Sequence, residues 1–106
     1  MIAELDTASF KAEVIEASVP VLVDFHASWC EPCHSQAPIL ENLARSLGKA
    51  ARVVKVDIDR APELADLFAV RSVPTLMVFS KGRITRRFTG VTTGTKLAAA
   101  LMEQLD

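Results

Sequence analysis

Apolar residues occur along the chain in two kinds of pattern, and segments of the two kinds follow one another. In the first pattern a short run is apolar or β-branched almost throughout, which is typical of a buried strand. Three runs have this pattern: residues 20–26, 52–58 and 75–79. In the second pattern apolar residues recur at helical spacing, as on one face of an amphipathic helix. Residues 31–47 have the full i, i+3, i+4, i+7 repeat. Three more segments have a shorter helical spacing: residues 7–17, a short segment from Pro62, and a segment from about Thr93 that we expect to bury Leu97, Leu101 and Leu105.

Two weaker signals complete the predicted order of elements. Residues 2–5 can form a short first strand, and Lys81-Gly82 has the composition of a tight hairpin turn into a last strand at residues 83–89. Alternating strands and helices imply parallel strands with right-handed crossovers, and the hairpin adds an antiparallel pair. We therefore predict an α/β fold with helices on both faces of one sheet, in a single domain over residues 1–106.

Composition and charge narrow the classes of function. The chain has 106 residues, half of them hydrophobic and 24% charged, with a net charge of -1. This balance gives no electrostatic basis for binding nucleic acid or an anionic membrane. No apolar run approaches the roughly 18 residues of a membrane helix, and the first residues lack the pattern of a signal peptide. We expect a monomer, because no large apolar surface stripe is evident. We expect a cytoplasmic location, because two cysteines in one motif fit a reducing setting.

The chain's two cysteines lie in one motif directly after the strand at residues 20–26: Trp29-Cys30-Glu31-Pro32-Cys33-His34. A single pair in a reducing setting is typical of catalysis or metal binding, not of a structural disulfide framework. If the helix begins near Pro32, free backbone N–H groups and the helix dipole favour a thiolate at Cys30. Cys30 is therefore expected to attack disulfides, and Cys33, one turn further, to resolve the mixed disulfide.

The alternative for this pair is half of a zinc site. His26 and His34 are close enough in sequence to suggest a set of two cysteines and two histidines. Structural zinc, however, usually draws on two ligand pairs that lie well apart in the chain. With His26 on a strand and His34 inside a helix, the four side chains are not expected to converge. We therefore favour redox chemistry and predict no metal site.

Asp24 is an anomaly in the predicted strand, because an unpaired carboxylate in an apolar strand costs several kcal/mol, on the order of 2–7. Burial should raise its pKa, and a buried acid near a redox pair can accept the proton that the resolving thiol loses. The alternative is that Asp24 pairs with a cation such as Lys55 on the neighbouring strand. The two roles are compatible, and the residues alone do not choose between them.

Several motifs follow one another along the chain: Val23-Asp24-Phe25, Trp29-Cys30-x-Pro32-Cys33, Ala37-Pro38-Ile39-Leu40, Lys55-Val56-Asp57-Ile58-Asp59, Val70-Arg71-Ser72-Val73-Pro74-Thr75-Leu76, and Gly82 with Gly90. In these motifs and in their order, the chain resembles the thioredoxin family over essentially its whole length. The resemblance implies a thioredoxin fold, a central mixed five-stranded sheet flanked by four helices. It also implies a protein-disulfide reductase that needs no bound cofactor.

The resemblance assigns roles to further residues. Cys30 resembles the family's exposed attacking cysteine and Cys33 its buried resolving one, while Asp24 resembles the buried acid beneath them, with Lys55 beside it. It also implies a cis Val73–Pro74 peptide facing the disulfide and a kink at the proline inside the helix, Pro38. The substrate groove would be formed by a set of surface residues: Trp29, Glu31, Pro32, Val73, Pro74 and Gly90. Its partners would be proteins with disulfides and an NADPH-dependent flavoprotein reductase.

The chain departs from the family's commonest motif at two positions and from the family's frequent residue at a third position outside it. Glu31 stands where glycine is usual, and His34 where lysine is usual. A carboxylate near Cys30 disfavours the thiolate, although Glu31 is also an acid that the helix dipole favours in a first turn. We expect His26, where the family often has tryptophan, to be a tolerated residue at the rim.

Two other functions remain open at this level. The protein could oxidise or isomerise disulfides, which needs a much less negative potential, or it could be a binding module in which the thiols are incidental. Three arginines in the last strand, Arg83, Arg86 and Arg87, are typical of a solvated sheet edge, and docking of acidic partners is the alternative.

Overall fold

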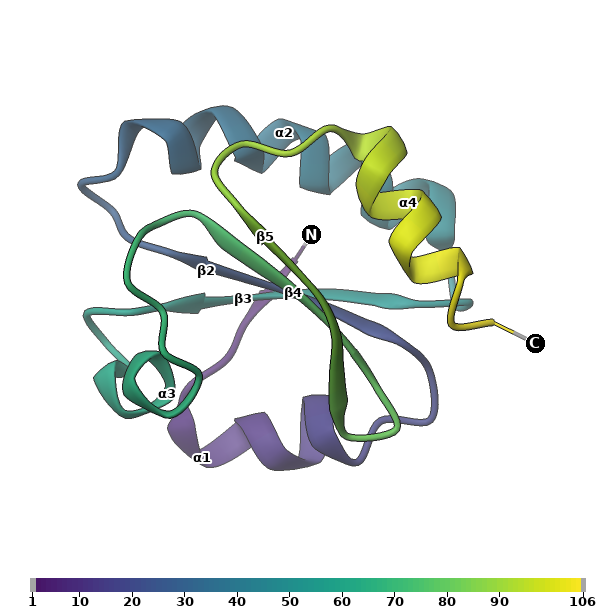
Figure 1. Cartoon of the computed structure of the whole chain (residues 1–106), viewed down its shortest axis with the longest axis horizontal. Coiled ribbons are helices and arrows are strands. Elements are labelled where there is room, and N and C mark those ends of the chain that lie inside the picture. Colours follow the sequence, from purple (N-terminus) through teal and green to yellow (C-terminus); the bar gives the residue numbers. More distant parts are fainter. Residues whose placement is uncertain (1, 106) are drawn as a thin grey trace.

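In the computed structural model, which describes residues 2–105, one mixed sheet lies between helices on both of its faces (Figure 1). The five strands are β1 (Ala3–Glu4), β2 (Val21–His26), β3 (Arg52–Asp57), β4 (Thr75–Ser80) and β5 (Arg83–Thr89). The helices are α1 (Thr7–Phe10), continued by a π-helical turn η1 (Lys11–Ile15), α2 (Glu31–Leu47), α3 (Pro62–Leu67) and α4 (Gly94–Met102). The predicted mixed five-stranded sheet with four flanking helices is confirmed. Met1 and Asp106, the ends of the predicted domain, lie outside the described residues.

The strands lie in the order β1-β3-β2-β4-β5. The first three are parallel, but β4 pairs antiparallel with β2, which corrects the expectation that alternation makes the strands before the hairpin parallel. The reason lies in the path of the connection over residues 58–74. α3 and the loop after it return the chain to the end of the sheet where β3 finishes, so Thr75, the first residue of β4, pairs with Phe25 near the end of β2.

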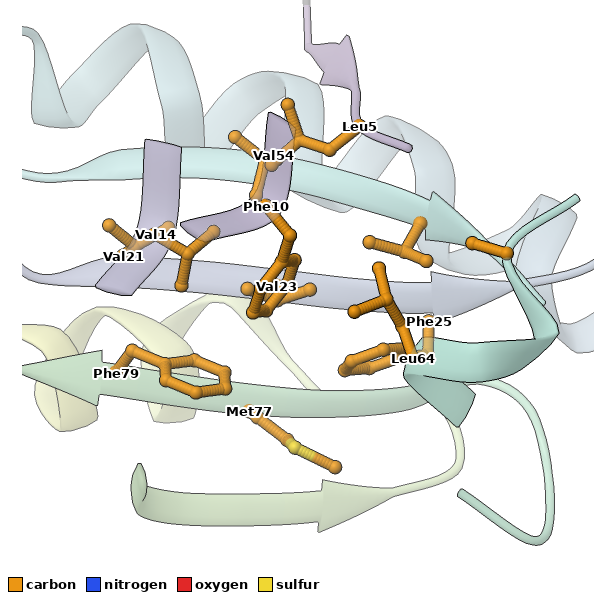
Figure 2. Close-up of a cluster of buried hydrophobic side chains, with 12 residues drawn as sticks. Leu5, Phe10, Val14, Val21, Val23, Phe25, Val54, Leu64, Met77 and Phe79 are labelled. Atoms are coloured by element: carbon orange, nitrogen blue, oxygen red, sulfur yellow. The ribbon is translucent and has the colours of Figure 1, made fainter. Parts of the chain in front are cut away.

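Strand alternation divides the core into two layers. On one face Val21, Val23 and Phe25 of β2 pack with residues of α1, η1 and α3, as Figure 2 shows. Phe10 and Phe79 meet edge to face there, with ring centroids 5.7 Å apart. On the other face the core joins residues of α2 and α4 to the sheet: Leu22, Leu40, Leu43, Leu76, Val78, Leu97 and Leu101 among others.

Local signals set most element ends. Asp6 caps α1, accepting a 2.9 Å hydrogen bond from the Ser9 backbone N–H. The predicted hairpin turn is confirmed, with φ of 53° at Lys81 and 79° at Gly82. A Cβ at Gly82 would lie 3.3 Å from the Ile15 carbonyl oxygen, so glycine also allows a close approach. One expectation was wrong, because α4 ends at Met102 and leaves Leu105 41% exposed.

The three arginines of the last strand lie on the exposed edge of the sheet, as predicted. Arg86 donates two hydrogen bonds to Glu103, of 3.0 and 2.9 Å, and Arg87 bonds to the Phe68 carbonyl. The guanidinium groups of Arg86 and Arg87 are therefore already engaged within the chain. Among residues 2–105 no helix has the length and apolar character needed to cross a bilayer.

Candidate active site

A disulfide joins Cys30 and Cys33 at the start of α2, with Cα atoms 5.3 Å apart. Cys30 is the N-cap of the helix, and the Cys33 backbone N–H donates a hydrogen bond of 3.2 Å to Cys30 Sγ. Pro32 lies in the first turn, where its missing N–H costs no helical hydrogen bond. An N–H donor and a helix dipole placed in this way favour a thiolate in the reduced state. The thiolate expected at Cys30 stays a prediction.

Exposure does not separate the two sulfurs. Cys30 is 3% exposed and Cys33 is 5% exposed, so the expectation of an exposed attacking cysteine is wrong for this disulfide state. The reason is that Ala27, Ile58 and Val73 pack around the pair. The helix N-cap and its N–H donor, rather than burial, distinguish Cys30 from Cys33.

Asp24 lies in the middle of β2 and is only 4% exposed. Its Oδ1 is buried and has no hydrogen-bond partner. Burial raises the pKa of this carboxyl to about 7, and the positive charge of Lys55 opposes the rise. Lys55 lies opposite Asp24 in the register of β3. Within residues 2–105, however, no side-chain nitrogen of a lysine, arginine or histidine lies within 4.0 Å of the Asp24 carboxylate oxygens. Asp24 is therefore a buried carboxyl group with a raised pKa and without a closed ion pair.

The loop before β4 approaches the cysteines. The Val73–Pro74 peptide is cis, and the Val73 carbonyl oxygen lies 3.5 Å from Cys30 Sγ. In the disulfide this is a contact only, since the sulfur carries no hydrogen, whereas the reduced thiol could donate there. The Gly90 N–H donates a 2.9 Å hydrogen bond to the Pro74 carbonyl, so Gly90 is held beside this loop.

Two features of the site were missed by the sequence predictions. The side chain of Trp29 is 67% exposed, and its Nε1–H donates a 2.8 Å hydrogen bond to Asp59 after β3. Gln36, fully buried in α2, bonds both ways with the Thr92 backbone, over 2.9 and 2.8 Å. The signal for Gln36 was a polar residue four positions before Leu40, on the apolar face of the helix.

The positions that depart from the family pattern lie around the pair. Glu31 is the first residue of α2 and is exposed. His34 is also exposed, and its Nε2 lies 3.0 Å from the Ser28 carbonyl oxygen. Pro38 lies inside α2, which continues through it to Leu47. The predicted kink at Pro38 stays a prediction.

His26 ends β2, as predicted, but its side chain is only 17% exposed, which places it further inside than a rim residue. Burial lowers the pKa of His26, while the Glu4 and Asp57 carboxylates act in the opposite direction. In the described part of the chain, no three histidine, cysteine, aspartate or glutamate side chains gather in a geometry that could hold a metal ion.

Comparison with known proteins agrees with this geometry. The family model for thioredoxin matches residues 1–103. Thioredoxin 1 of Synechococcus elongatus is 42% identical over 103 residues, which cover 97% of this chain and 96% of that protein. Thioredoxin of Rhodospirillum rubrum is 42% identical over 94 residues, which cover 89% and 90%.

A third similar protein is the bifunctional thioredoxin reductase/thioredoxin of Mycobacterium leprae. It is 42% identical over 103 residues, which cover 97% of this chain but only 22% of that protein. The match over almost the whole chain and the disulfide at the start of α2 lead to one conclusion. The chain belongs to the thioredoxin family and is a dithiol–disulfide oxidoreductase with the activity of a protein-disulfide reductase.

Proposed function

We propose that Cys30 is the attacking nucleophile, Cys33 the resolving thiol and Asp24 the acceptor of the Cys33 proton. The observation that carries the assignment is the hydrogen bond from the Cys33 N–H to Cys30 Sγ at the helix N-cap. A donor aimed at one sulfur lowers the pKa of that thiol relative to the other. Cys30 is therefore the sulfur that enters the reaction as thiolate.

The reaction has two exchange steps. The Cys30 thiolate attacks one sulfur of a substrate disulfide, so the substrate S–S bond breaks, a mixed disulfide forms, and the other substrate sulfur leaves as a thiolate that takes a proton from water. Cys33 gives its thiol proton to the Asp24 carboxylate and attacks Cys30 Sγ. The Cys30–Cys33 bond forms, the substrate leaves as a thiolate that takes a proton from water, and two electrons have passed to the substrate. Asp24 suits this role because a pKa of about 7 makes it a base near neutral pH.

The assignment of the two sulfurs is tested by trapping. Cys33→Ser should accumulate the mixed disulfide with a protein substrate, visible as a stable adduct by mass spectrometry. Cys30→Ser should form no adduct under the same conditions. The reverse result, an adduct with Cys30→Ser alone, would show that the two roles are exchanged.

The role of Asp24 is tested separately. Asp24→Asn should slow the second exchange step about a hundredfold, a typical loss for a general base. It should also remove the inflection near pH 7 from the pH profile of disulfide exchange. An unchanged rate across the whole pH range would contradict proton transfer to Asp24.

We further propose that the substrate segment lies in a groove formed by Trp29, Glu31, Pro32, Val73, Pro74 and Gly90. Two contacts support this placement: Val73 O lies 3.5 Å from Cys30 Sγ, and Gly90 bonds to Pro74 O. An extended peptide there could pair with the Val73 backbone next to the reacting sulfur. Crosslinking of the Cys33→Ser adduct should report contacts with these residues.

A flavoprotein reductase that uses NADPH is the proposed electron donor. The support is that the similar protein of Mycobacterium leprae is a bifunctional thioredoxin reductase/thioredoxin. Turnover of NADPH in a mixture of such a reductase, this chain and a disulfide protein tests the proposal. A monomer in a reducing compartment such as the cytoplasm is the form in which we expect the protein to work, and sedimentation velocity checks the monomer.

A further inference from the structure

A row of ionisable residues close to Asp24 extends over three neighbouring parallel strands, β1, β3 and β2. The register places Glu4 of β1 opposite Lys55 of β3, and Lys55 opposite Asp24 of β2. One step further along the same strands, His26 lies opposite Asp57. Alternate residues of a strand point to the same face, so these five side chains share one side of the sheet.

That side is the one covered by α2. Leu22 of β2 has the same alternation as Asp24 and His26, and it packs in the core with Leu40 and Leu43 of α2. The N-terminus of α2 carries Cys33, the thiol whose proton Asp24 is proposed to accept. The ionisable row therefore lies on the same side of the sheet as the redox pair.

His26 links Asp24 to the solvent edge of this row. Its Nε2 is buried without a hydrogen-bond partner and lies 3.6 Å from Glu4 Oε1. Glu4 is 32% exposed in its side chain, and its Oε2 lies 3.7 Å from Nη1 of Arg60, which is 80% exposed. On the other side, Asp24 is two residues away on the same strand face, about 6.6 Å between Cα atoms.

The other groups on this face cannot carry a proton away from Asp24 in the same way. The Lys55 ammonium has donors only and accepts no proton. Asp57 Oδ1 already accepts a hydrogen bond of 2.9 Å from the Asp59 N–H. From α2, the uncharged Gln36 amide is bonded to the Thr92 backbone, and Cys33 is the proton donor itself.

A neutral imidazole can accept a proton at one nitrogen and release another from the second. Burial lowers the pKa of His26 and so favours this neutral form near pH 7. Asp24, in contrast, is enclosed and must lose its proton after each turnover to act again as a base. His26 can therefore accept and release the proton that Asp24 must lose, and Glu4 is exposed enough to pass it to water.

We propose that His26 is a positioning residue for this proton and passes it from Asp24 to Glu4 at the solvent edge. The inference rests on the proposed role of Asp24 as proton acceptor. The O–H bond of protonated Asp24 breaks as an N–H bond forms on one ring nitrogen of His26, directly or across one water molecule. The proton on Nε2 then leaves for Glu4 Oε1 and water, and no electrons move. Asp24 is thereby returned to its carboxylate form.

The test is the rate of the second exchange step, followed in a single turnover without reductase through the fluorescence of Trp29, the chain's only tryptophan. Near pH 6 Asp24 starts mostly protonated and must release that proton through His26 before it can accept the proton of Cys33, so His26→Gln should slow this step about tenfold there and approach the wild-type rate by about pH 9. Glu4→Gln should slow it about threefold in the same pH range. The matched control is Glu13→Gln, which removes a carboxylate 3.5 Å from Arg52, at the opposite end of β3 from Asp57, and should leave the rate unchanged.

A second variant separates proton transfer from packing. In His26→Ala, added imidazole should restore the rate in proportion to its concentration, whereas pyrazole, a ring of the same shape but a far weaker base, should not. Equal rescue by both rings, or a His26→Gln rate equal to wild type at every pH, would overturn the inference, and a wild-type rate in Glu4→Gln would overturn the Glu4 step. If Asp24→Asn is slow while His26→Gln is not, only this inference fails. If Asp24→Asn is also unaffected, the proposed role of Asp24 fails as well.

Discussion

The indole N–H of Trp29 and the carboxylate of Asp59 form a 2.8 Å hydrogen bond that fixes an exposed aromatic ring beside Cys30. Asp59 is itself held, because its backbone N–H donates to the Asp57 carboxylate at the end of β3. The orientation of the indole therefore depends on a loop that lies thirty residues away in the sequence. A ring fixed in this way presents a preformed apolar surface to a substrate, with little rotamer freedom left to lose.

Asp59→Ala should weaken the binding of protein disulfides without altering the chemistry. Loss of one solvent-exposed hydrogen bond corresponds to about 1 kcal/mol, or about fivefold in KM. The value of kcat should stay close to wild type, and the anisotropy of Trp29 fluorescence should fall as the ring gains freedom. Asp59→Asn, which keeps an acceptor oxygen, is the matched control. A larger effect on kcat than on KM would contradict a role in binding alone.

The buried carboxyl of Asp24 should make stability depend on pH in a definite direction. Its pKa is raised to about 7 in the folded chain from 3.8, so the folded state favours the protonated form. The stabilising contribution is complete below pH 3.8 and is lost as pH rises through about 7. Asp24→Asn cannot ionise, so at alkaline pH it should be more stable than wild type by roughly 2–4 kcal/mol. Urea unfolding on both sides of pH 7 measures the difference.

One outcome of this unfolding experiment would contradict the prediction for Asp24→Asn. If the variant and wild type lose stability in parallel as the pH rises, Asp24 is not the group that titrates. The comparison needs the disulfide form of both proteins, because reduction adds two titrating thiols.

Lys55 should act on this same titration. Its positive charge lowers the pKa of Asp24 against the larger effect of burial. Lys55→Met should therefore raise the Asp24 pKa further, by about 1 unit. The carboxyl ¹³C shift of Asp24 as a function of pH gives this value directly. Lys49→Met, which removes an exposed lysine after α2, should leave the Asp24 titration at its wild-type midpoint.

Glu31 should make the reduction potential more negative. At about 7 Å from Cys30 and an effective dielectric of 20–80, its charge opposes the thiolate by roughly 0.6–2.4 kcal/mol, and the exposed position favours the low end through screening. Glu31→Gly should therefore have a potential less negative by about 10–30 mV, measured against glutathione. Glu31→Gln is the decisive control, because it removes the charge and keeps a helix-forming side chain. Equal potentials in all three proteins would leave Glu31 only its role as a first-turn acid.

The sequence predicted the elements well where one local signal dominated. The apolar run of β2 and the Lys81-Gly82 turn are examples, because each depends on neighbours in the chain. The direction of β4 was not predicted, since it depends on the path of the whole connection over residues 58–74, about which no local pattern gives information. Leu105 was placed in the core because it continues a helical spacing, but α4 ends before it.

For the site, sequence reasoning identified the cysteines and Asp24 because each is chemically conspicuous in its setting. It could not find the Trp29–Asp59 bond, which joins two loops that only the folded sheet brings together. It also took His26 for a rim residue, because a strand end gives no information about the neighbouring β1. Contacts across strands distant in sequence were the information that was lacking.

The pair of hydrogen bonds between Gln36 and the Thr92 backbone has a consequence for the working cycle. These bonds tie α2 to the segment after Gly90 through atoms that neither gain nor lose electrons. The Cys30–Cys33 disulfide can therefore be reduced and formed again while α2 and the segment after Gly90 keep their spacing. The amide of Gln36 therefore sets the position of α2 relative to this segment, and each catalytic cycle begins from the same backbone arrangement as the previous one.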